Sequence, residues 1–368
     1  MDMTADKGYL LLEDGTIIEG ESFGYKTSVS GEVVFTTSMV GYPESLTDPS
    51  YFGQILTFTY PIIGNYGVPK PIYIGPSLVE NFESERIRIR GLIVSQYVDT
   101  PSHYSSHQTL RQWLIKEKIP ALSAIDTRLL TQKLREKGVM KGQIFFDLKK
   151  KGEFVDINAE DLISQVTIKK PILYESKKKR FKKPLLLFDC GIKHGMIREL
   201  LKRDFTVLRV PWNFTVSNCD DYSGVMISNG PGDPVMAKQT IVEVAKFLKT
   251  NIPVFGICLG NQILGLAAGG KTYKLKYGHR ATNQPVKDTT SNHSYITTHN
   301  HGFAVDTKSL SSEWKEWFVN LNDGTNEGIH HKSKPFFTVQ FHSEANPGPE
   351  DTKWIFDYFA KTIENYES

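Results

Sequence analysis

At 368 residues the chain exceeds the usual size of a single hydrophobic core, so two domains are expected, and 39% apolar and 23% charged residues are typical of a globular protein. The 44 basic and 41 acidic residues nearly balance, which argues against a nucleic acid or a membrane surface as partner. There are only three cysteines, without paired spacing, which argues against a disulfide framework and favours a reducing compartment.

The N-terminal residues carry no recognisable targeting signal. Residues Met1 to Lys7 contain two acids and no apolar core, unlike a secretory signal or an Arg-rich transit peptide. No apolar run approaches the length that spans a bilayer. We therefore expect a cytoplasmic protein.

The first half of the chain begins with strand patterns and continues with helix patterns. Short strand-like runs such as Tyr9 to Leu12 and Glu32 to Thr36 alternate with turn signals. Helical periodicity follows at Gln108 to Lys118 and at Thr127 to Lys137. Asp126 is a suitable N-cap for the second helix, and Gly138 a suitable residue to end it. Residues 1–150 are thus predicted to form a mixed, β-rich α/β domain.

A basic segment separates the two halves. Between Lys149 and Pro184 the composition shifts, with three lysines at one end and the run Lys177 to Lys183 at the other. Because aromatic residues other than Phe181 are not interleaved, we interpret this run as a solvated connector rather than an anion-binding patch. The interdomain linker is placed at residues 151–183.

The second half, residues 184–368, alternates strands with helices. Pro184 to Phe188 is a continuous apolar run, the pattern of a strand covered on both faces. Later elements are expected at Met196–Lys202, Phe205–Val210, Gly224–Ser228, Ile241–Leu248 and Ile252–Phe255. Such alternation predicts a doubly wound α/β domain with its site at the carboxyl ends of the strands.

Cys258 stands at one of those ends, inside the pentapeptide Gly256 to Gly260. An apolar strand precedes it and a helix-like stretch, Asn261 to Ala268, follows. Small residues on both sides of a nucleophile permit the sharp strand-to-helix turn of a nucleophile elbow. The alternative is a buried structural cysteine, but the paired glycines favour a reactive thiol.

A thiolate nucleophile needs a base, and His342 is the best candidate. It follows the strand-like run Phe336 to Phe341 and precedes Glu344 by two positions, so on an extended chain the carboxylate and the imidazole would point the same way. This is the nucleophile, base and orienter arrangement of a triad. The pairs His103/His107 and His330/His331 lack metal-ligand context, and no metal site is predicted.

Two glycine-rich segments need separate interpretations. Ser228 to Pro234 follows a buried strand, and its glycines would let backbone N–H groups approach an oxyanion, although an ordinary Pro-Gly turn has the same composition. Gly265 to Thr272 matches the P-loop pattern, but it lies at the end of a helix and Lys271 to Tyr277 is predicted to be a strand, whereas a P-loop follows a strand and opens a helix. We predict no ATP site there.

Taken together, these residues resemble a class I glutamine amidotransferase, and the likeness extends over nearly the whole chain to the small subunit, or equivalent N-terminal domain, of glutamine-dependent carbamoyl-phosphate synthetase. The motifs that carry it in the first half are Gly31–Phe35, Gly41–Glu44, Leu46–Tyr51, Tyr60–Asn65, Ile125–Arg128 and Leu134–Gly138. Residues Lys271 to Lys274 are more similar to the animal-type pyrimidine fusion enzymes. The resemblance implies a swivelling β/β/α-type first domain and a flavodoxin-like second domain.

The resemblance also implies roles for particular residues. Cys258 would be the nucleophile, His342 the general base and acid, and Glu344 its orienter. The implied glutamine contacts are Ser50, Gly230, Gly232, Leu259, Gln262, Asn300, Gly302 and Phe303. Because Ser50 belongs to the first domain, that domain is expected to pack near the catalytic cleft.

Three departures from the family pattern are present. Asn261 stands where the family usually has His, Ser343 stands where it usually has Pro, and Ala281-Thr282 replaces paired glycines. Loss of the fixed φ of proline is expected to loosen the geometry between His342 and Glu344 and to slow turnover.

The implied partner is an ATP- and bicarbonate-using synthetase, either a large subunit or a fused domain, which would receive ammonia from L-glutamine. This chain itself is expected to need no cofactor. Two other functions stay open: a catalytically idle regulatory glutamine-binding module, and a stand-alone thiol hydrolase of γ-glutamyl substrates. The sequence does not distinguish pyrimidine from arginine synthesis, or a natural subunit from part of a fusion.

Overall fold

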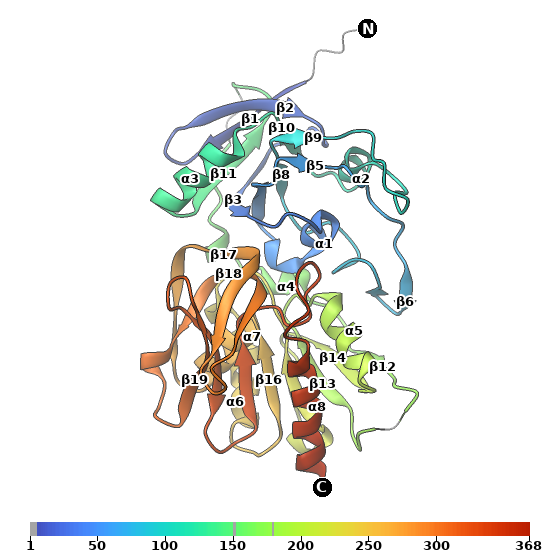
Figure 1. Cartoon of the computed structure of the whole chain (residues 1–368), viewed down its shortest axis with the longest axis vertical. Helices are drawn as coiled ribbons and strands as arrows, with labels where there is room; N and C mark the ends of the chain where they lie inside the picture. Colours follow the sequence, from blue (N-terminus) through green and yellow to red (C-terminus); the bar gives the residue numbers. More distant parts are fainter. Residues whose placement is uncertain (1–5, 150–151, 179) are drawn as a thin grey trace.

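The structure is a computed structural model that describes residues 6–149, 152–178 and 180–368. It has two parts, with the first half of the chain stacked on the second (Figure 1). The N-terminal residues 1–5 and parts of both lysine runs lie outside the described residues. None of the described helices is both long and apolar enough to cross a membrane.

The first part is built on a closed barrel whose strand order is β1-β11-β3-β4-β8-β10-β2. Its strands are β1 (Lys7–Leu12), β2 (Ile17–Ser22), β3 (Val29–Thr36), β4 (Gln54–Phe58), β8 (Gly91–Ile93), β10 (Ala121–Ser123) and β11 (Met140–Phe145). Short pairs lie outside it: β5 (Ile62–Ile63) with β9 (Gln96–Tyr97), and β6 (Tyr73–Gly75) with β7 (Leu78–Val79). The sequence predicted a β-rich domain, and closure of the barrel is a tertiary feature that short strand patterns do not indicate.

Three helices accompany the barrel: α1 (Tyr42–Thr47), α2 (Leu110–Lys116) and α3 (Thr127–Lys137). The side chain of Asp126 accepts a hydrogen bond from the backbone N–H of Leu129, and Gly138 ends α3 at φ 103°, so both predicted ends of this helix are confirmed. Thr109 and Gln112 form a capping box on α2, which therefore begins two residues later than predicted.

The segment predicted as a linker contains ordered structure. It includes α4 (Ile163–Val166) and β12 (Ile172–Tyr174), and β12 pairs with β14 (Val207–Pro211) at the edge of the second sheet. Ile157 and Leu162 are buried, and both lie close to Gly53 of the first part. The sequence did not predict this packing, because the apolar residues of the segment are isolated among polar ones and form no periodic pattern.

The second part contains a parallel sheet in the order β14-β13-β15-β16-β21, so the predicted doubly wound domain is confirmed and its strand order is the flavodoxin-like order 2-1-3-4-5. Its strands are β13 (Leu185–Asp189), β14, β15 (Gly224–Ile227), β16 (Val254–Ile257) and β21 (Phe336–Val339). The helices of this part are α5 (His194–Lys202), α6 (Lys238–Phe247), α7 (Leu259–Ala267) and α8 (Trp354–Glu367). Every residue of β13 is buried, as its continuous apolar run predicted.

An antiparallel extension continues this sheet beyond β21. It consists of β20 (Asn326–His331), β19 (Trp314–Asn320), β17 (Lys271–Asp288) and β18 (Ser294–Asp306). Only the start of β17 was predicted as a strand. Gly269, at φ 86°, ends α7 immediately before β17, so the P-loop-like sequence lies at a helix end as predicted.

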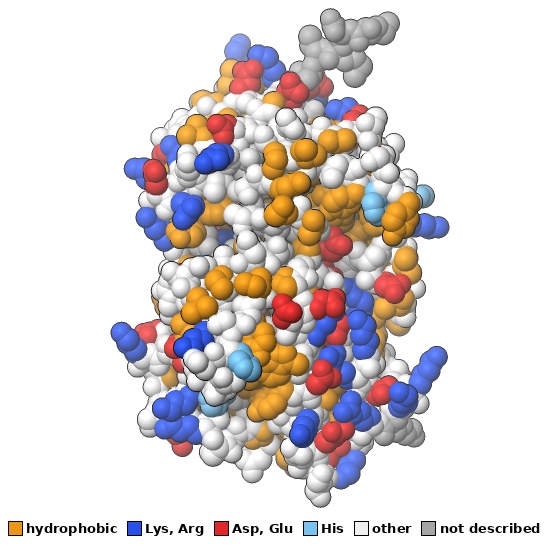
Figure 2. Space-filling view, viewed as in Figure 1, with side chains coloured by type: hydrophobic (Ala, Val, Ile, Leu, Met, Phe, Trp, Pro, Cys, Tyr) orange, Lys and Arg blue, Asp and Glu red, His pale blue; other side chains and the backbone are white. Residues whose placement is uncertain are grey.

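The surface and the cysteines agree with the compositional reasoning. Cys190, Cys219 and Cys258 are all free. Acidic and basic side chains are interspersed on the face of the second part shown in Figure 2, without a large area of one sign. This distribution matches the nearly balanced net charge.

Candidate active site

Cys258 occupies a strained turn between β16 and α7. Its φ of 58° and ψ of −105° lie outside the regions that non-glycine residues normally adopt. Its backbone N–H donates to the carbonyl of Val339 at 2.8 Å, which anchors the turn to the neighbouring strand β21. The predicted strand, sharp turn and helix are confirmed.

Both flanking glycines are required by close packing. A Cβ at Gly256 would lie 2.5 Å from the carbonyl oxygen of Gly260, and one at Gly260 would lie 2.2 Å from the carbonyl oxygen of Ile227. No side chain fits at such distances, so the turn exists only with glycine on both sides.

His342 and Glu344 are adjacent, but not for the predicted reason. β21 ends at Val339 rather than Phe341, and His342 and Glu344 lie in a turn beyond it, where the N–H of Ala345 donates to the carbonyl of His342 at 3.1 Å. Nδ1 of His342 lies 2.7 Å from Oε1 of Glu344. The turn therefore brings the two side chains together, and an extended chain is not involved.

The remaining imidazole nitrogen is available for the thiol. Since a carboxylate only accepts, Nδ1 of His342 is the donor to Glu344. Nε2 is buried without a hydrogen-bond partner in the part of the chain that the structure describes. Burial alone would lower the pKa of His342, but the Glu344 carboxylate and the neighbouring Cys258 outweigh it and raise that pKa.

Lys193 is a site residue that the sequence reasoning missed. Its buried ammonium group lies 3.0 Å from Oε1 of Glu344 and donates to the carbonyl of Ala345 at 2.6 Å. Burial alone would raise the pKa of Glu344, but Lys193 and His342 hold it well below its usual range. The available signal was a lysine directly after the first strand of a parallel sheet, where site residues gather.

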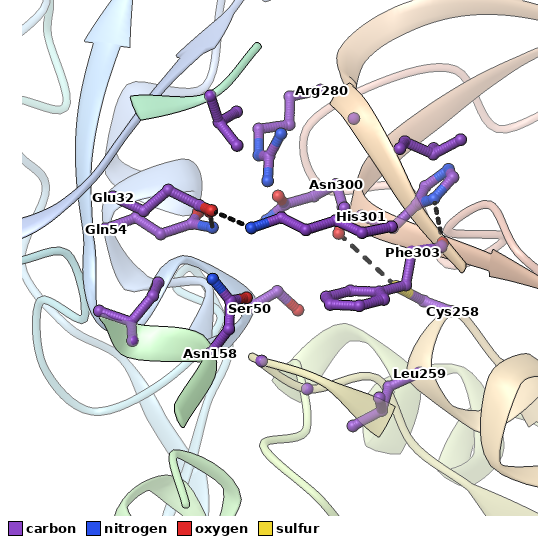
Figure 3. Close-up of a pocket in the computed structure, with 18 of the residues that line it drawn as sticks. Glu32, Ser50, Gln54, Asn158, Cys258, Leu259, Arg280, Asn300, His301 and Phe303 are labelled. Carbon is purple, nitrogen blue, oxygen red and sulfur yellow. Dashed lines mark hydrogen bonds and ion pairs between the residues drawn. The ribbon is translucent and has the colours of Figure 1, made fainter. Parts of the chain in front are cut away.

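All the predicted glutamine contacts line one pocket together with Cys258: Ser50, Gly230, Gly232, Leu259, Gln262, Asn300, Gly302 and Phe303. Figure 3 shows Ser50, Glu32 and Gln54 on one side of this pocket and Cys258, Leu259 and Phe303 on the other. His342 and Glu344 are buried and are not among the lining residues. The thiol of Cys258 lies 3.6 Å from the carbonyl oxygen of Asn300.

The first domain contributes directly to this pocket, as Ser50 suggested. The side-chain amide of Asn229 donates to Oγ of Ser50 at 2.8 Å, and that of Asn300 donates to Asp48 at 2.8 Å. Asp48 in turn accepts from the backbone N–H of Ser50 at 2.9 Å. These buried bonds fix the loop around Ser50 against the second domain, and Asp48 and Asn229 were not predicted.

Charged side chains of both signs also line the pocket and were not predicted. Glu32, from β3, forms an ion pair of 2.7 Å with Lys274 of β17 and accepts from Gln54 at 3.0 Å. Arg280 is buried beside them, and its Nε has no hydrogen-bond partner within the described residues. The pocket therefore suits a small molecule that carries both a positive and a negative group.

The glycine-rich turn after β15 lies against the elbow. A Cβ at Gly230 would lie 2.1 Å from the carbonyl oxygen of Cys190 and 2.8 Å from the side chain of Leu259. Gly232 has a φ of 83°, which favours glycine. The turn thus borders the pocket at the carboxyl end of its strand, where the sequence placed it.

Asn261 and Ser343, two of the departures from the family pattern, do not disturb the contact between His342 and Glu344. Asn261 is buried, donates to Oε1 of Gln340 at 3.0 Å and accepts from Thr338 at 2.6 Å. Ser343 leaves the His342–Glu344 contact at 2.7 Å, so the expected loosening is not observed. The amide of Gln262 already donates to the carbonyl of Phe303 at 2.8 Å, and its place in the pocket wall is partly structural.

Glu83 links the first domain to the same machinery. It is buried, accepts from the backbone N–H of Gly195 at 3.0 Å and forms a 2.5 Å ion pair with Arg198. Both partners belong to α5, and Lys193 is the N-cap residue of that helix. A carboxylate at a helix N-terminus also interacts favourably with the helix dipole. Glu83 therefore anchors the first domain to α5, the helix for which Lys193 is the N-cap residue.

Two families match this chain in succession. Residues 10–144 match the family described as carbamoyl-phosphate synthase small chain, CPSase domain, and residues 186–362 match glutamine amidotransferase class-I.

Individual relatives align over nearly the whole chain. The carbamoyl phosphate synthase small chain of Pyrococcus furiosus is 46% identical over 97% of this chain and 98% of its own length. The arginine-specific small chain of Neurospora crassa is 44% identical over 99% of this chain and 82% of its own. The multifunctional protein pyr1-3 of Dictyostelium discoideum is 47% identical over 97% of this chain, which spans 17% of that protein.

Replacing Glu83 by Gln should destabilise the protein, because Arg198 loses its buried counterion. We expect the free energy of unfolding to fall by about 3 kcal/mol, measured by urea denaturation. Glu80→Gln, at an exposed neighbouring position, should change it by less than about 0.5 kcal/mol. Equal denaturation midpoints for the two variants would contradict the proposed interdomain role of Glu83.

Proposed function

The chain belongs to the family of carbamoyl phosphate synthase small chains, and on that premise we propose that it hydrolyses L-glutamine to glutamate and ammonia for carbamoyl phosphate synthesis. It is a glutamine amidotransferase. The observation that carries this proposal is the strained Cys258 elbow, which shares one pocket with the predicted glutamine contacts and lies beside the buried His342–Glu344 pair.

In the first step the thiolate of Cys258 attacks the side-chain amide carbon of glutamine. A C–S bond forms, and the amide oxygen becomes an oxyanion held by backbone N–H groups of Leu259 and of the turn from Gly230 to Gly232. One such donor typically stabilises the transition state by about 3 kcal/mol. The helix dipole of α7 favours negative charge at the same place.

His342 carries the protons through the remaining steps. Its imidazolium protonates the departing ammonia as the C–N bond breaks, leaving a thioester on Cys258. The neutral imidazole then deprotonates a water molecule, which attacks the thioester and releases glutamate and the thiolate. Glu344 and Lys193 are positioning residues, because they hold the imidazole without touching the reacting atoms.

The charged residues of the pocket supply the recognition of an amino acid. In this proposal Glu32, which forms an ion pair with Lys274, receives the α-ammonium group of glutamine, and Arg280, whose Nε has no partner among the described residues, receives its α-carboxylate. Charge-assisted hydrogen bonds of this kind are stronger than neutral ones. Ser50 and Asn300 complete the wall between them.

The partner in this proposal is an ATP-using synthetase, which consumes the ammonia together with bicarbonate. This synthetase is either a separate large chain or a domain fused to this one. Both arrangements are possible because the chain spans 98% of the Pyrococcus small chain but 17% of the Dictyostelium multifunctional protein. The relatives include separate small chains and a multifunctional protein, and one of the small chains is named arginine-specific. They therefore do not distinguish arginine synthesis from pyrimidine synthesis for this chain. The cytoplasmic location and the absence of a cofactor on this chain stay predictions.

The idle-module alternative is less well supported than catalysis. It rested on Asn261 and Ser343, and neither residue displaces His342 from Glu344. The stand-alone hydrolase is disfavoured because the first domain matches the synthase family over residues 10–144.

Cys258→Ser should abolish glutamine hydrolysis, with kcat reduced by more than about 10⁴-fold because the nucleophile is lost. A diazo-ketone glutamine analogue should label the wild-type chain at Cys258, detectable by mass spectrometry. Cys219→Ser, on a partly exposed 3-10 turn, should leave both hydrolysis and labelling unchanged. Full activity of Cys258→Ser would exclude this mechanism, and failure to label wild-type protein would support the idle module.

Glu344→Gln should move the alkaline limb of the kcat profile to lower pH. The carboxylate raises the pKa of His342, so its loss lets the imidazolium give up its proton at a lower pH. Glutaminase rates measured from pH 6 to about 10 would locate this limb. Glu350→Gln, at an exposed position, is the matched control, and an unshifted limb in Glu344→Gln would be evidence against the orienting role.

Glutamine hydrolysis should be stimulated roughly tenfold by the synthetase partner with ATP and bicarbonate, within the usual range of coupling between sites. Cys258→Ser should form the same complex and support carbamoyl phosphate synthesis from added ammonium salts but not from glutamine. If the rate of glutamine hydrolysis is the same with and without the partner, the stand-alone hydrolase would be favoured.

A further inference from the structure

A second cluster of chemically active side chains lies behind the glutamine pocket. It consists of His279 on β17, His299 and His301 on β18, and Glu327 on β20, and we call it the histidine cluster. One ligand atom from each residue lies within 4.8 Å of all the others. All four side chains are buried, with at most 8% of any of them exposed.

Hydrogen bonds around the cluster fix which nitrogen of two rings faces inward. The hydroxyl of Thr297 donates to the carbonyl of Gln284 at 2.8 Å, so it accepts from Nε2–H of His299 at 2.7 Å. The carbonyl of Phe303 accepts from Nδ1–H of His301 at 2.9 Å. The lone pairs of His299 Nδ1 and His301 Nε2 therefore point at each other, 3.1 Å apart.

His279 is held in the same manner from outside the cluster. The carboxylate of Asp323 accepts from its Nε2–H at 2.9 Å, while its Nδ1 faces Oε1 of Glu327 at 3.2 Å. Histidines that bind metals usually donate their other N–H to a carboxylate, a carbonyl or a similar acceptor. All three histidines of the cluster have such an acceptor.

Glu327 completes the set of inward-facing atoms. Its Oε1 accepts from Asn320 at 2.9 Å, but its Oε2 has no hydrogen-bond partner among the described residues. This oxygen lies 3.4 Å from Nδ1 of His299 and 3.9 Å from Nε2 of His301. Two facing lone pairs and an unpartnered buried carboxylate oxygen repel one another unless a proton or a metal cation lies between them.

The separations suit a tetrahedral metal ion. Zinc binds imidazole nitrogen and carboxylate oxygen at about 2.0–2.1 Å, which places neighbouring ligand atoms about 3.3 Å apart. His299 Nδ1, His301 Nε2 and Oε2 of Glu327 are separated by 3.1, 3.4 and 3.9 Å, while His279 Nδ1 lies 3.2 Å from the other oxygen, Oε1, of Glu327. All four ligand atoms lie within 4.8 Å of one another, and the side chains would close around the ion to reach the tetrahedral spacing.

We propose that the histidine cluster binds one zinc-like divalent ion through His279 Nδ1, His299 Nδ1, His301 Nε2 and Glu327. Three imidazoles and one carboxylate favour zinc over magnesium or calcium, which prefer all-oxygen sites. Four protein ligands leave no open position, so the ion has a structural role.

The position of the cluster explains what the ion would stabilise. It joins β17, β18 and β20 in the antiparallel extension, and His299 and His301 flank Asn300. The carbonyl of Phe303 accepts from both His301 and Gln262, so the ion would hold one wall of the glutamine pocket in place. The sequence predicted no metal site, because the ligands are spread over three strands that it did not identify.

The test is metal binding by the full chain, and its readouts do not depend on glutaminase activity. Protein purified without chelator should contain about one zinc ion per chain by elemental analysis, as expected for a closed four-ligand site. Metal-free protein titrated with Co²⁺ should develop the visible bands of a tetrahedral complex, and Zn²⁺ should raise its unfolding temperature.

Matched variants separate specific binding from adventitious metal. Glu327→Gln removes a ligand and should abolish the cobalt bands, whereas His293→Gln, at an exposed position between β17 and β18, should leave them intact. Thr297→Val removes only the acceptor of His299 and should weaken zinc binding about 10- to 100-fold. Thr298→Val, at the next position of β18, should leave zinc binding unchanged.

Metal-free wild-type protein that shows neither cobalt bands nor a zinc-dependent rise in unfolding temperature would overturn the proposal. That outcome would mean that shared protons satisfy the histidine cluster. Equal zinc binding by wild type and Glu327→Gln would overturn it as well. Neither result would bear on glutamine hydrolysis, which Cys258→Ser tests separately.

Discussion

The buried ion pair between Lys193 and Glu344 is the interaction on which the active site depends. Glu344 has no access to solvent, and a carboxylate in that position would otherwise take up a proton. Lys193 keeps it charged, and the charged carboxylate orients His342 toward the thiol. Because Lys193 begins α5, anything that moves this helix also moves the triad.

The first domain reaches the triad through the same helix. Glu83 binds the first turn of α5 and Arg198 one turn later, while Asp48 and Ser50 bind Asn300 and Asn229 across the domain boundary. The pocket is therefore built jointly by both domains.

Local sequence signals predicted most elements of the second domain and failed where long-range packing intervenes. The alternation of β13 to β16 with helices was sufficient to predict the parallel sheet. The antiparallel extension was missed because β17 and β18 carry polar residues such as His279 and His301, whose burial depends on partners in other strands. The barrel was missed for a similar reason, since closure leaves no local pattern.

By itself the sequence determined the elbow at Cys258, the pairing of His342 with Glu344 and the pocket-lining residues that belong to family motifs, because short-range sterics and motifs depend on residues that are close together in the chain. Only the tertiary structure decided that His342 and Glu344 meet in a turn, that Lys193 neutralises the carboxylate, and that Glu83, Asp48 and the histidine cluster support the pocket. The contacts of Glu83 with Arg198, of Lys193 with Glu344 and of Asp48 with Asn300 join residues 115 to 252 positions apart, and a buried charge acquires its partner only when the chain has folded around it.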